Sequence, residues 1–575
     1  MPIAQTTLMT WLGGRGSRWQ SDAHDCLFLF VIGTLTMASY AVQLGFYGDD
    51  WALLASMHLS KNQSLIDVFT EIVHVHDHEI RPVQFLELAV LYKLFGLDPL
   101  GYHLTNSTIL LLDFLLLYFL VRVLGQPRVL ALSVSLLFIL APSYSTDRFW
   151  IASSAANLSM CFFLLSLHAH LQALRHPRGG FLRWEALAIL GVLCSGFCYE
   201  VFLPLFLLAS AFLFAFELKT KWSRFAVGRI VGKAVLHQTA IVGAVALILV
   251  VKALWAPRVP GNLELIGLAV WTGRAILKAA VINYGYHLLL LPSTTWHVLK
   301  YYVDFTMVVM AVVIGFAVWI RLYTLPSFLI GSAGKLRAKM PIYLGCGIGL
   351  FLAGYSLFPI KPAEIGPNNR AAIAGTVGVA VSVIGGLGIL TSLSPRMWRK
   401  PIFCSAVAFI SMSGALIIAA LGNFWIESYR MQKEILSDIQ DHVPVIPAGA
   451  SLILDGVCPY NGPAPVFNAT WDLSGALSLA YGRLGVEANI VTQWVTVEQN
   501  GLSVPTYADR VIYPFGKLYI YHYGRKSSHV LRDAQAAQSY FDDISTDRVD
   551  RCPPDDDGNG VDVMNGLVAK LRGRE

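Results

Sequence analysis

Residues 27–46 read LFLFVIGTLTMASYAVQLGF, a run without any charged side chain, and residues 47–51 that follow it read YGDDW. A bilayer span needs about 20 consecutive apolar residues. Because lipid offers the backbone no hydrogen-bonding partner, such a run must be helical. The stretch therefore predicts a membrane-spanning helix that ends before two adjacent acids, Asp49 and Asp50, at the edge of the lipid.

Most of the remaining chain is similarly apolar. Of its 575 residues 55% are hydrophobic and 14% are charged, and the mean hydropathy is +0.56. Soluble proteins carry roughly a quarter charged residues. The apolar runs predict a polytopic α-helical membrane protein with about eleven transmembrane helices, near residues 27–46, 104–123, 128–142, 150–171, 184–199, 201–217, 234–255, 300–320, 341–358, 371–391 and 402–425.

Basic residues fall on alternate loops between these spans. They cluster at Arg15/Arg18, Arg122/Arg128, Arg175/Arg178/Arg183, Lys219/Lys221/Arg224, Arg321/Lys335/Arg337/Lys339 and Arg396/Arg399/Lys400. Loops rich in Lys and Arg stay in the cytoplasm. We therefore expect a cytoplasmic N-terminus and an outer C-terminus.

The net charge of +6 comes from the basic residues in these loops and does not indicate a nucleic-acid partner. No retrieval signal ends the chain, which favours a bacterial inner membrane.

The composition divides the chain into two parts. Residues 1–426 form the predicted transmembrane domain, with a long first outer loop at 47–103. Residues 427–575 are polar, and runs such as 451–454 and 510–513 read as strands. This part predicts a small α/β domain on the outer, periplasmic face. Two cysteines of this part, Cys458 and Cys552, are candidates for a disulfide in an oxidising compartment.

The first outer loop holds the first group of candidate site residues. Asp49 and Asp50 can supply a general base or a metal ligand, or one of them can cap the following helix. Further along, His76, His78 and Glu79 could hold a divalent metal if they share a strand face, or could simply lie in a polar loop. Arg81 suits phosphate recognition because its planar guanidinium matches phosphate oxygens, although it could also reach toward lipid headgroups.

Three more charged residues lie in later outer turns. Glu200 stands between two apolar runs with no room for a long loop, so its carboxylate must lie at the membrane edge, where charge is costly and usually functional. Lys361 and Arg370 place positive charge on the same side as Asp49 and Asp50.

The order and spacing of these motifs over residues 27–204 resembles the GT-C superfamily of polytopic glycosyltransferases, which contains protein O-mannosyltransferases and bacterial aminoarabinose transferases. The similarity is carried by the acidic pair, by Arg81-Pro82-Val83 with the run from Leu94 to Asn106 that includes His103, by Glu200 with Pro204, and by the outer C-terminal domain. Tyr199 stands where the superfamily usually has Lys, which leaves the role of that turn open.

The resemblance implies an inverting sugar transfer from a polyprenyl-phosphate donor. Asp49 or Asp50 would take a proton from the acceptor hydroxyl, and Arg81, with Arg370 or Lys361, would stabilise the leaving phosphate. Glu200 and His103 are further candidates for substrate binding. The acceptor, whether lipid, glycan or protein, and any need for a divalent metal are left open.

Two other classes of protein fit parts of the sequence. A lipid-linked-sugar flippase or transporter would show internal repeats and polar residues at mid-membrane depth, whereas here the polar residues gather at the outer rim. A non-catalytic scaffold for envelope assembly would use the C-terminal domain for binding.

Overall fold

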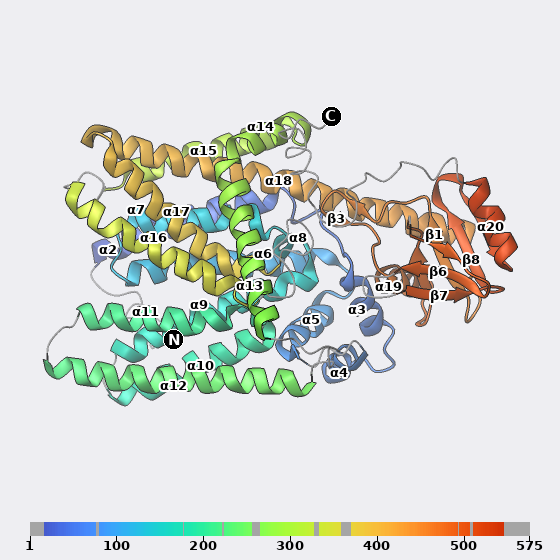
Figure 1. The fold of residues 1–575 in the computed structure, drawn as a ribbon, viewed down its shortest axis with the longest axis horizontal. Helices are drawn as coiled ribbons and strands as arrows, with labels where there is room; N and C mark the ends of the chain where they lie inside the picture. Colours follow the sequence, from blue (N-terminus) through green and yellow to red (C-terminus); the bar gives the residue numbers. More distant parts are fainter. Residues whose placement is uncertain are drawn as a thin grey trace.

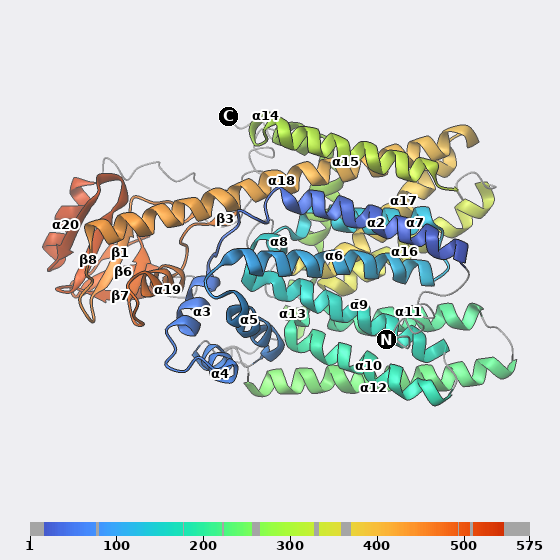
Figure 2. The same cartoon turned by 180° about the vertical axis from the view of Figure 1, so that it is seen from behind.

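The computed structural model describes residues 16–75, 80–175, 178–220, 224–255, 265–326, 333–357, 370–492, 494–505 and 510–544. Figure 1 shows a bundle of long, roughly aligned helices with a smaller α/β domain beyond one end, and Figure 2 shows the same arrangement from behind. The long helix α18 runs along the bundle and continues into the small domain (Figures 1 and 2).

The helices alternate between long apolar rods and short connecting pieces. Their bounds are α2 (Gly16–Ala38), α3 (Asp49–His58), α4 (Leu65–Val75), α5 (Pro82–Phe95), α6 (Pro99–Val123), α7 (Arg128–Ile139), α8 (Thr146–Phe149), α9 (Ser154–Arg175), α10 (Arg178–Cys198), α11 (Leu203–Thr220), α12 (Arg224–Trp255), α13 (Leu265–Ala280), α14 (Leu291–Tyr301), α15 (Phe305–Thr324), α16 (Ala333–Tyr355), α17 (Ala372–Leu393), α18 (Arg396–His442), α19 (Thr470–Ala480) and α20 (Ala534–Asp543). Short 3₁₀ turns cover Pro142–Tyr144, Ile151–Ser153, Glu200–Phe202 and Tyr523–Arg525, and a π-helix covers Val281–Leu289.

The α/β domain is built on a four-stranded sheet in the order β4 (Glu487–Ile490), β1 (Ser451–Asp455), β8 (Leu518–His522), β9 (Ser527–Leu531). Strand β1 is parallel to both β4 and β8, while β8 and β9 are antiparallel. Strands β5 (Thr496–Val497), β6 (Gly501–Pro505) and β7 (Arg510–Pro514) form an antiparallel sheet, and β2 (Tyr460–Asn461) pairs with β3 (Ala464–Pro465). The runs at 451–454 and 510–513 are strands, as predicted.

The chain is an integral membrane protein, and its helices confirm part of the predicted set of spans. Seven helices among the described residues are long and apolar enough to cross a membrane: Pro99–Val123, Ile151–Arg175, Gly180–Cys198, Val231–Trp255, Phe305–Thr324, Ala372–Leu393 and Arg396–His442. Each overlaps a predicted span. A bent pair, Ala269–Leu289 with Leu291–Tyr301, would make eight. The predicted total of about eleven is not confirmed among the described residues. The runs at 128–142 and 201–217 form shorter apolar helices, and the helices α2 and α16, which overlap the runs at 27–46 and 341–358, are not among the seven.

The first predicted span differs from the sequence expectation at its end. Helix α2 stops at Ala38, and residues 39–43 form turns before the chain reaches the acidic pair. The predicted domain boundary at 427 lies inside α18, so one continuous helix belongs to both parts of the chain. The division into 1–426 and 427–575 stays a prediction.

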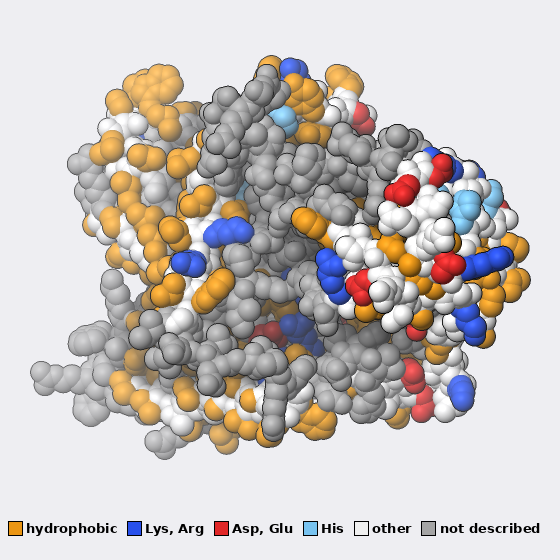
Figure 3. Space-filling view, turned by 45° about the vertical axis from the view of Figure 1, so that its right-hand side comes forward, with side chains coloured by type: hydrophobic (Ala, Val, Ile, Leu, Met, Phe, Trp, Pro, Cys, Tyr) orange, Lys and Arg blue, Asp and Glu red, His pale blue; other side chains and the backbone are white. Residues whose placement is uncertain are grey.

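Several of the basic clusters meet at the end of the bundle that lies away from the α/β domain. Arg122 pairs with Asp22 at 2.9 Å, and Arg128 and Arg321 both pair with Asp25, at 2.6 and 2.5 Å. Figure 3 shows hydrophobic side chains over much of the bundle, whereas charged side chains gather on the α/β domain. The surface therefore changes from mainly hydrophobic on the helical bundle to mainly polar on the α/β domain.

Candidate functional site

The acidic pair opens helix α3 at the end of the bundle that faces the α/β domain. The N-cap residue is Gly48, with φ of 49°, so neither acid occupies the capping position. Asp50 is buried, and its carboxylate accepts hydrogen bonds from the backbone N–H groups of Tyr47 at 3.0 Å and Ala152 at 2.8 Å. Asp50 thereby joins the loop that leads into α3 to the 3₁₀ turn before α9.

Asp49 has a different environment from that of its neighbour. Its side chain is half-buried, and its Oδ1 accepts a hydrogen bond of 2.7 Å from the indole N–H of Trp471 in α19. Helix α19 lies against α3 so closely that a Cβ at Gly475 would come within 2.6 Å of the Trp51 backbone. The α/β domain therefore supplies a direct partner to Asp49.

The peptide of Ala152 joins the acidic pair to helix α5. Its N–H donates to Asp50, and its carbonyl accepts a 2.9 Å hydrogen bond from the side chain of Gln84. Gln84 lies one turn after Arg81, which is the N-cap residue of α5. Asp50 and Arg81, which are separated by helix α4 and its loops, are thus linked through the segment before α9.

Arg81 belongs to an ion cluster with Glu200 and Lys252. The Arg81 guanidinium pairs with Glu200 at 2.8 Å and stacks over the Tyr199 ring at 4.6 Å. Lys252 pairs with the same carboxylate at 2.9 Å and donates to the carbonyl of Ile80. Burial alone would raise the pKa of Glu200, but the two cations hold that pKa below its usual value. The guanidinium of Arg81 thus stacks on Tyr199, the residue that stands where the GT-C motif usually has Lys.

Arg370 completes the group from the residues just before α17. Its guanidinium lies over the Trp150 ring at 5.8 Å, and its positive charge acts on Tyr199 and Asp147. Within the described residues no carboxylate pairs with Arg370. Burial raises the pKa of Asp147 well above its usual value, even though Arg370 and Arg148 oppose the shift. Arg370 is therefore a cation that is still available to an anionic ligand.

Sequence reasoning missed Lys252 and Asp147. Lys252 lies at the end of an apolar span that the positive-inside pattern predicts to face outward and to carry few cations, and that exception is the signal that could have found it. Asp147 lies in a short loop, 143–149, in which no other acid occurs. Both residues belong to the site because of interactions with residues distant in the sequence, Glu200 for Lys252 and Arg370 for Asp147.

The other predicted site residues lie apart from this ion cluster or outside the description. His103 is buried in α6, and its Nε2 lies 2.8 Å from the carbonyl of Gly45, just before the acidic pair. Lys361 and the metal candidates His76, His78 and Glu79 lie outside the described residues. Cys458 is disulfide-bonded. Its predicted partner, Cys552, lies outside the described residues.

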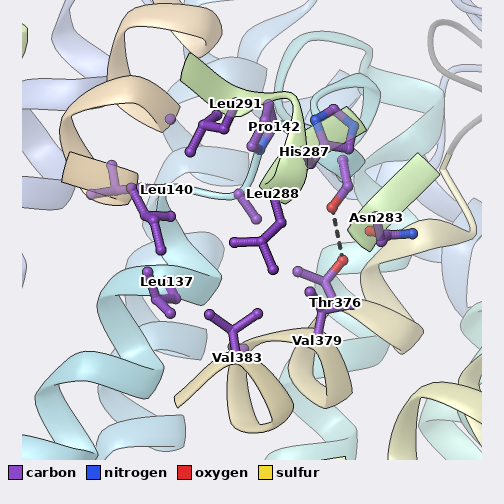
Figure 4. Close-up of a pocket in the computed structure, with 15 residues that line it drawn as sticks. Leu137, Leu140, Pro142, Asn283, His287, Leu288, Leu291, Thr376, Val379 and Val383 are labelled. Atoms are coloured by element: carbon purple, nitrogen blue, oxygen red, sulfur yellow. Dashed lines mark hydrogen bonds between the residues drawn. The ribbon is translucent and has the colours of Figure 1, made fainter. Parts of the chain in front are cut away.

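A small cavity of about 50 Å³ lies inside the bundle next to this end (Figure 4). Most of its wall is apolar, with Leu137, Leu140 and Val383 among the residues that line it. Its polar lining includes Thr376 and Ser143, which share a hydrogen bond of 3.1 Å, together with Asn283 and His287. Thr376 lies six residues after Arg370, so the polar part of the cavity is near the cationic group.

The fold and this site define an integral membrane protein that gathers carboxylates and cations at one end of its helical bundle, beside an apolar cavity. No protein-family model matches the sequence. A search of curated proteins also finds no match.

Among the solved structures that are similar to this chain are two of ArnT from Cupriavidus metallidurans. The structure in the apo state has 14% sequence identity and a TM-score of 0.32, with 81% of this chain and 85% of that chain covered. The structure bound to undecaprenyl phosphate has 14% identity and a TM-score of 0.34, with 84% and 87% covered. ArnT belongs to the GT-C superfamily that the sequence motifs resemble. At these TM-scores the likeness does not define the function of this chain.

Proposed function

We propose that the chain is a glycosyltransferase that moves a sugar from a polyprenyl-phosphate donor to an acceptor hydroxyl on the outer face of the membrane. The observation that carries this proposal is that the segment 150–152 contacts Asp50, Gln84 and Arg370 at the end of the bundle that faces the α/β domain. Asp49 is the neighbour of Asp50 in the sequence, and Arg81 lies one helical turn before Gln84. A donor of this type needs a base, a phosphate site and an apolar channel within reach of one another.

Asp49 is the better candidate for the base. Asp50 is fully engaged by two backbone N–H donors and is shielded from solvent, whereas Asp49 is half-buried and keeps Oδ2 free of any hydrogen bond within the described residues. The acceptor oxygen would form a bond to the anomeric carbon while the bond from that carbon to the phosphate oxygen breaks. The proton of the hydroxyl passes to Asp49. Attack from the face opposite the phosphate inverts the anomeric configuration.

Arg370 and Arg81 are the proposed partners of the leaving phosphate. Arg370 pairs with no carboxylate in the described part of the chain, and Arg81 and Lys252 together carry one more positive charge than Glu200 neutralises. Fixed positive charge lowers the energy of a transition state in which negative charge develops on phosphate. Lys361 is a further proposed member of this group. The cavity beside Thr376 is too small in this structure for a polyprenyl chain, so it would have to widen to admit the first isoprene unit next to the phosphate.

The proposal also includes an inner-membrane location, with the α/β domain in the periplasm next to the acceptor. A divalent metal at His76, His78 and Glu79 stays a prediction. The residues around Asp49 and Trp471 would select the sugar and the acceptor class.

The test is donor turnover by purified protein in detergent, with several polyprenyl-phosphate sugars and a mixture of hydroxyl acceptors. We expect Asp49→Asn to lower kcat by about 10²- to 10⁴-fold, the usual contribution of a general base. Its melting temperature should hold, because the amide keeps an oxygen for Trp471. Asp50→Asn should lose thermal stability as well, because its amide N–H₂ would face a backbone N–H donor.

Asp67→Asn is the matched control, since Asp67 is an exposed acid in the same outer segment that contacts Ser64. Equal release of polyprenyl phosphate by the wild type, Asp49→Asn and Asp67→Asn would exclude Asp49 as the base. Donor binding without turnover in all three proteins would favour a flippase.

A further inference from the structure

A second polar cluster lies inside the bundle, well away from the acidic pair. It consists of His170 on α9, Glu185 on α10 and His237 on α12, three helices that pack on one another. Each residue offers a ligand atom, and these atoms all lie within 4.8 Å of one another. All three side chains are buried. We propose that these residues form a structural site for a divalent transition-metal ion of the zinc type.

The cluster has polar atoms that the protein leaves unsatisfied. His237 Nδ1 lies 2.7 Å from one carboxylate oxygen of Glu185. Within the described residues, the other Glu185 oxygen, His237 Nε2 and both ring nitrogens of His170 have no hydrogen-bond partner. Burying such groups without partners costs free energy. A bound cation would satisfy the imidazole nitrogens and the carboxylate together.

The donor set selects the class of ion. Two imidazoles and one carboxylate are a common Zn²⁺ ligand set, whereas Mg²⁺ and Ca²⁺ prefer oxygen ligands throughout. Ligand bonds of about 2.1 Å in a tetrahedral site put the ligand atoms roughly 3.4 Å apart, so the ligand atoms that now lie farthest apart need to approach by up to about 1.4 Å. Three protein ligands leave one position for a water molecule.

The two imidazole rings must also reorient. They are stacked with their centroids 3.3 Å apart and their planes 14° from parallel, so their lone pairs do not point at one ion. Rotation about χ2 of His170 corrects this, because the χ2 torsion of His is broad and no hydrogen bond within the described residues holds either nitrogen. The nearest cation on α12, Lys233, is held by the carbonyl of Ala173 at 3.1 Å.

The position of the cluster indicates a structural role. His170 is sixteen residues along α9 from Ser154, which is about 24 Å at the helical rise per residue. Lys252 lies fifteen residues beyond His237 on α12, a similar distance. An ion here would fasten α12 to α9 and α10 at the end remote from the rim where Lys252 meets Glu200. The proposal is independent of sugar transfer.

The test uses full-length protein purified without a histidine tag, stripped with EDTA and titrated with Zn²⁺ alone. We expect close to one Zn²⁺ per chain by elemental analysis and a rise in melting temperature of at least about 2 °C. The double variant His170→Ala/His237→Ala should lose both effects. His168→Ala is the matched control, because His168 is a buried histidine of the same helix whose Nε2 contacts the carbonyl of Leu116. It should keep the ion.

A second measurement covers the case in which the double variant does not fold. Co²⁺ added to the stripped wild type should give the visible absorption of a tetrahedral nitrogen and oxygen site, and Zn²⁺ should abolish it. Wild-type protein that takes up neither ion would overturn the proposal. So would binding that persists in His170→Ala/His237→Ala and disappears in His76→Ala/His78→Ala/Glu79→Ala.

Discussion

At the scale of single residues, Glu87 on α5 is a carboxyl group in an unusual environment. Both its oxygens are buried without a hydrogen-bond partner in the described part of the chain, and burial raises its pKa to about 8. Nearby residues such as Val83, Leu91 and Leu158 are apolar and line a pocket with it. The folded protein therefore holds Glu87 protonated at neutral pH.

This shifted pKa makes stability depend on pH. Unfolded Glu87 loses its proton near pH 4.5, whereas the folded protein keeps it up to about pH 8. The folded state binds more protons in this window, so the free energy of unfolding should fall as pH rises from about 4.5 to 8, by an upper limit of roughly 5 kcal/mol. Glu87→Gln should remove this part of the pH dependence. Melting temperatures in detergent at pH 5, 7 and 9 measure it, and parallel curves for the wild type and the variant would contradict it.

Among the site residues, sequence patterns could predict the side chains that stand at the edge of an apolar run. Asp49, Asp50, Arg81 and Glu200 are of this kind, because a charge beside lipid is costly and so is conspicuous in the sequence. The sequence patterns could not show which of Asp49 and Asp50 is the candidate base and which is held by backbone hydrogen bonds. That division depends on Trp471, more than 400 residues away in the sequence, which reaches Asp49 and not Asp50.

At the scale of elements, helices α16 and α17 make backbone contact through small residues. A Cβ added at Gly378 on α17 would clash with the backbone nitrogen of Phe351 on α16. A Cβ added at Gly354 on α16 would lie 2.6 Å from the backbone nitrogen of Gly375 on α17. Glycine allows such close approach of membrane helices, which depend on van der Waals packing. Because Arg370 lies just before α17 and Thr376 lies within it, this contact also fixes two groups of the proposed donor site.

Gly378→Ala should therefore destabilise the protein by about 1–3 kcal/mol, as overpacking does in a close-packed interior. It should also raise the KM for the donor, because α17 must move with Arg370. Gly386→Ala is the control on the same helix, since a Cβ there meets nothing within 4 Å. Thermal unfolding of both variants tests this, and an unchanged melting temperature for Gly378→Ala would refute the close contact.

The long apolar helices were predictable from the sequence, whereas their connections were not. Hydropathy finds a rod such as Ala372–Leu393 because every face of it is apolar. It does not find where α2 ends, since residues 39–46 remain apolar through a turn. Helix α18, in contrast, continues well beyond its apolar run, as far as His442. Its polar part is held in place because Gln432 has buried hydrogen-bond partners in Trp51 and the carbonyl of Val466.

At the scale of the whole molecule, the two ends of the bundle differ in chemistry. At one end Arg122, Arg128 and Arg321 pair with Asp22 and Asp25. At the other end the acidic pair contacts the α/β domain, and the Arg81 cluster is linked to that pair through the segment 150–152. Charged groups at both ends and an apolar middle fit a bilayer between them. The alternation of basic loops then predicts that the α/β domain lies outside.

This orientation can be tested with single cysteines at the two ends. Met397 is 75% exposed at the start of α18, and Ser528 is exposed on strand β9 of the α/β domain. In spheroplasts of a bacterial host, a membrane-impermeant maleimide should label Ser528→Cys at once and Met397→Cys only after the membrane is permeabilised. The wild-type chain sets the background, because Cys26, Cys194 and Cys346 are partly exposed free thiols. Labelling of Met397→Cys in intact spheroplasts, with Ser528→Cys protected, would invert the topology. It would also move the acidic pair to the cytoplasmic face and remove the basis for an outer-face transferase.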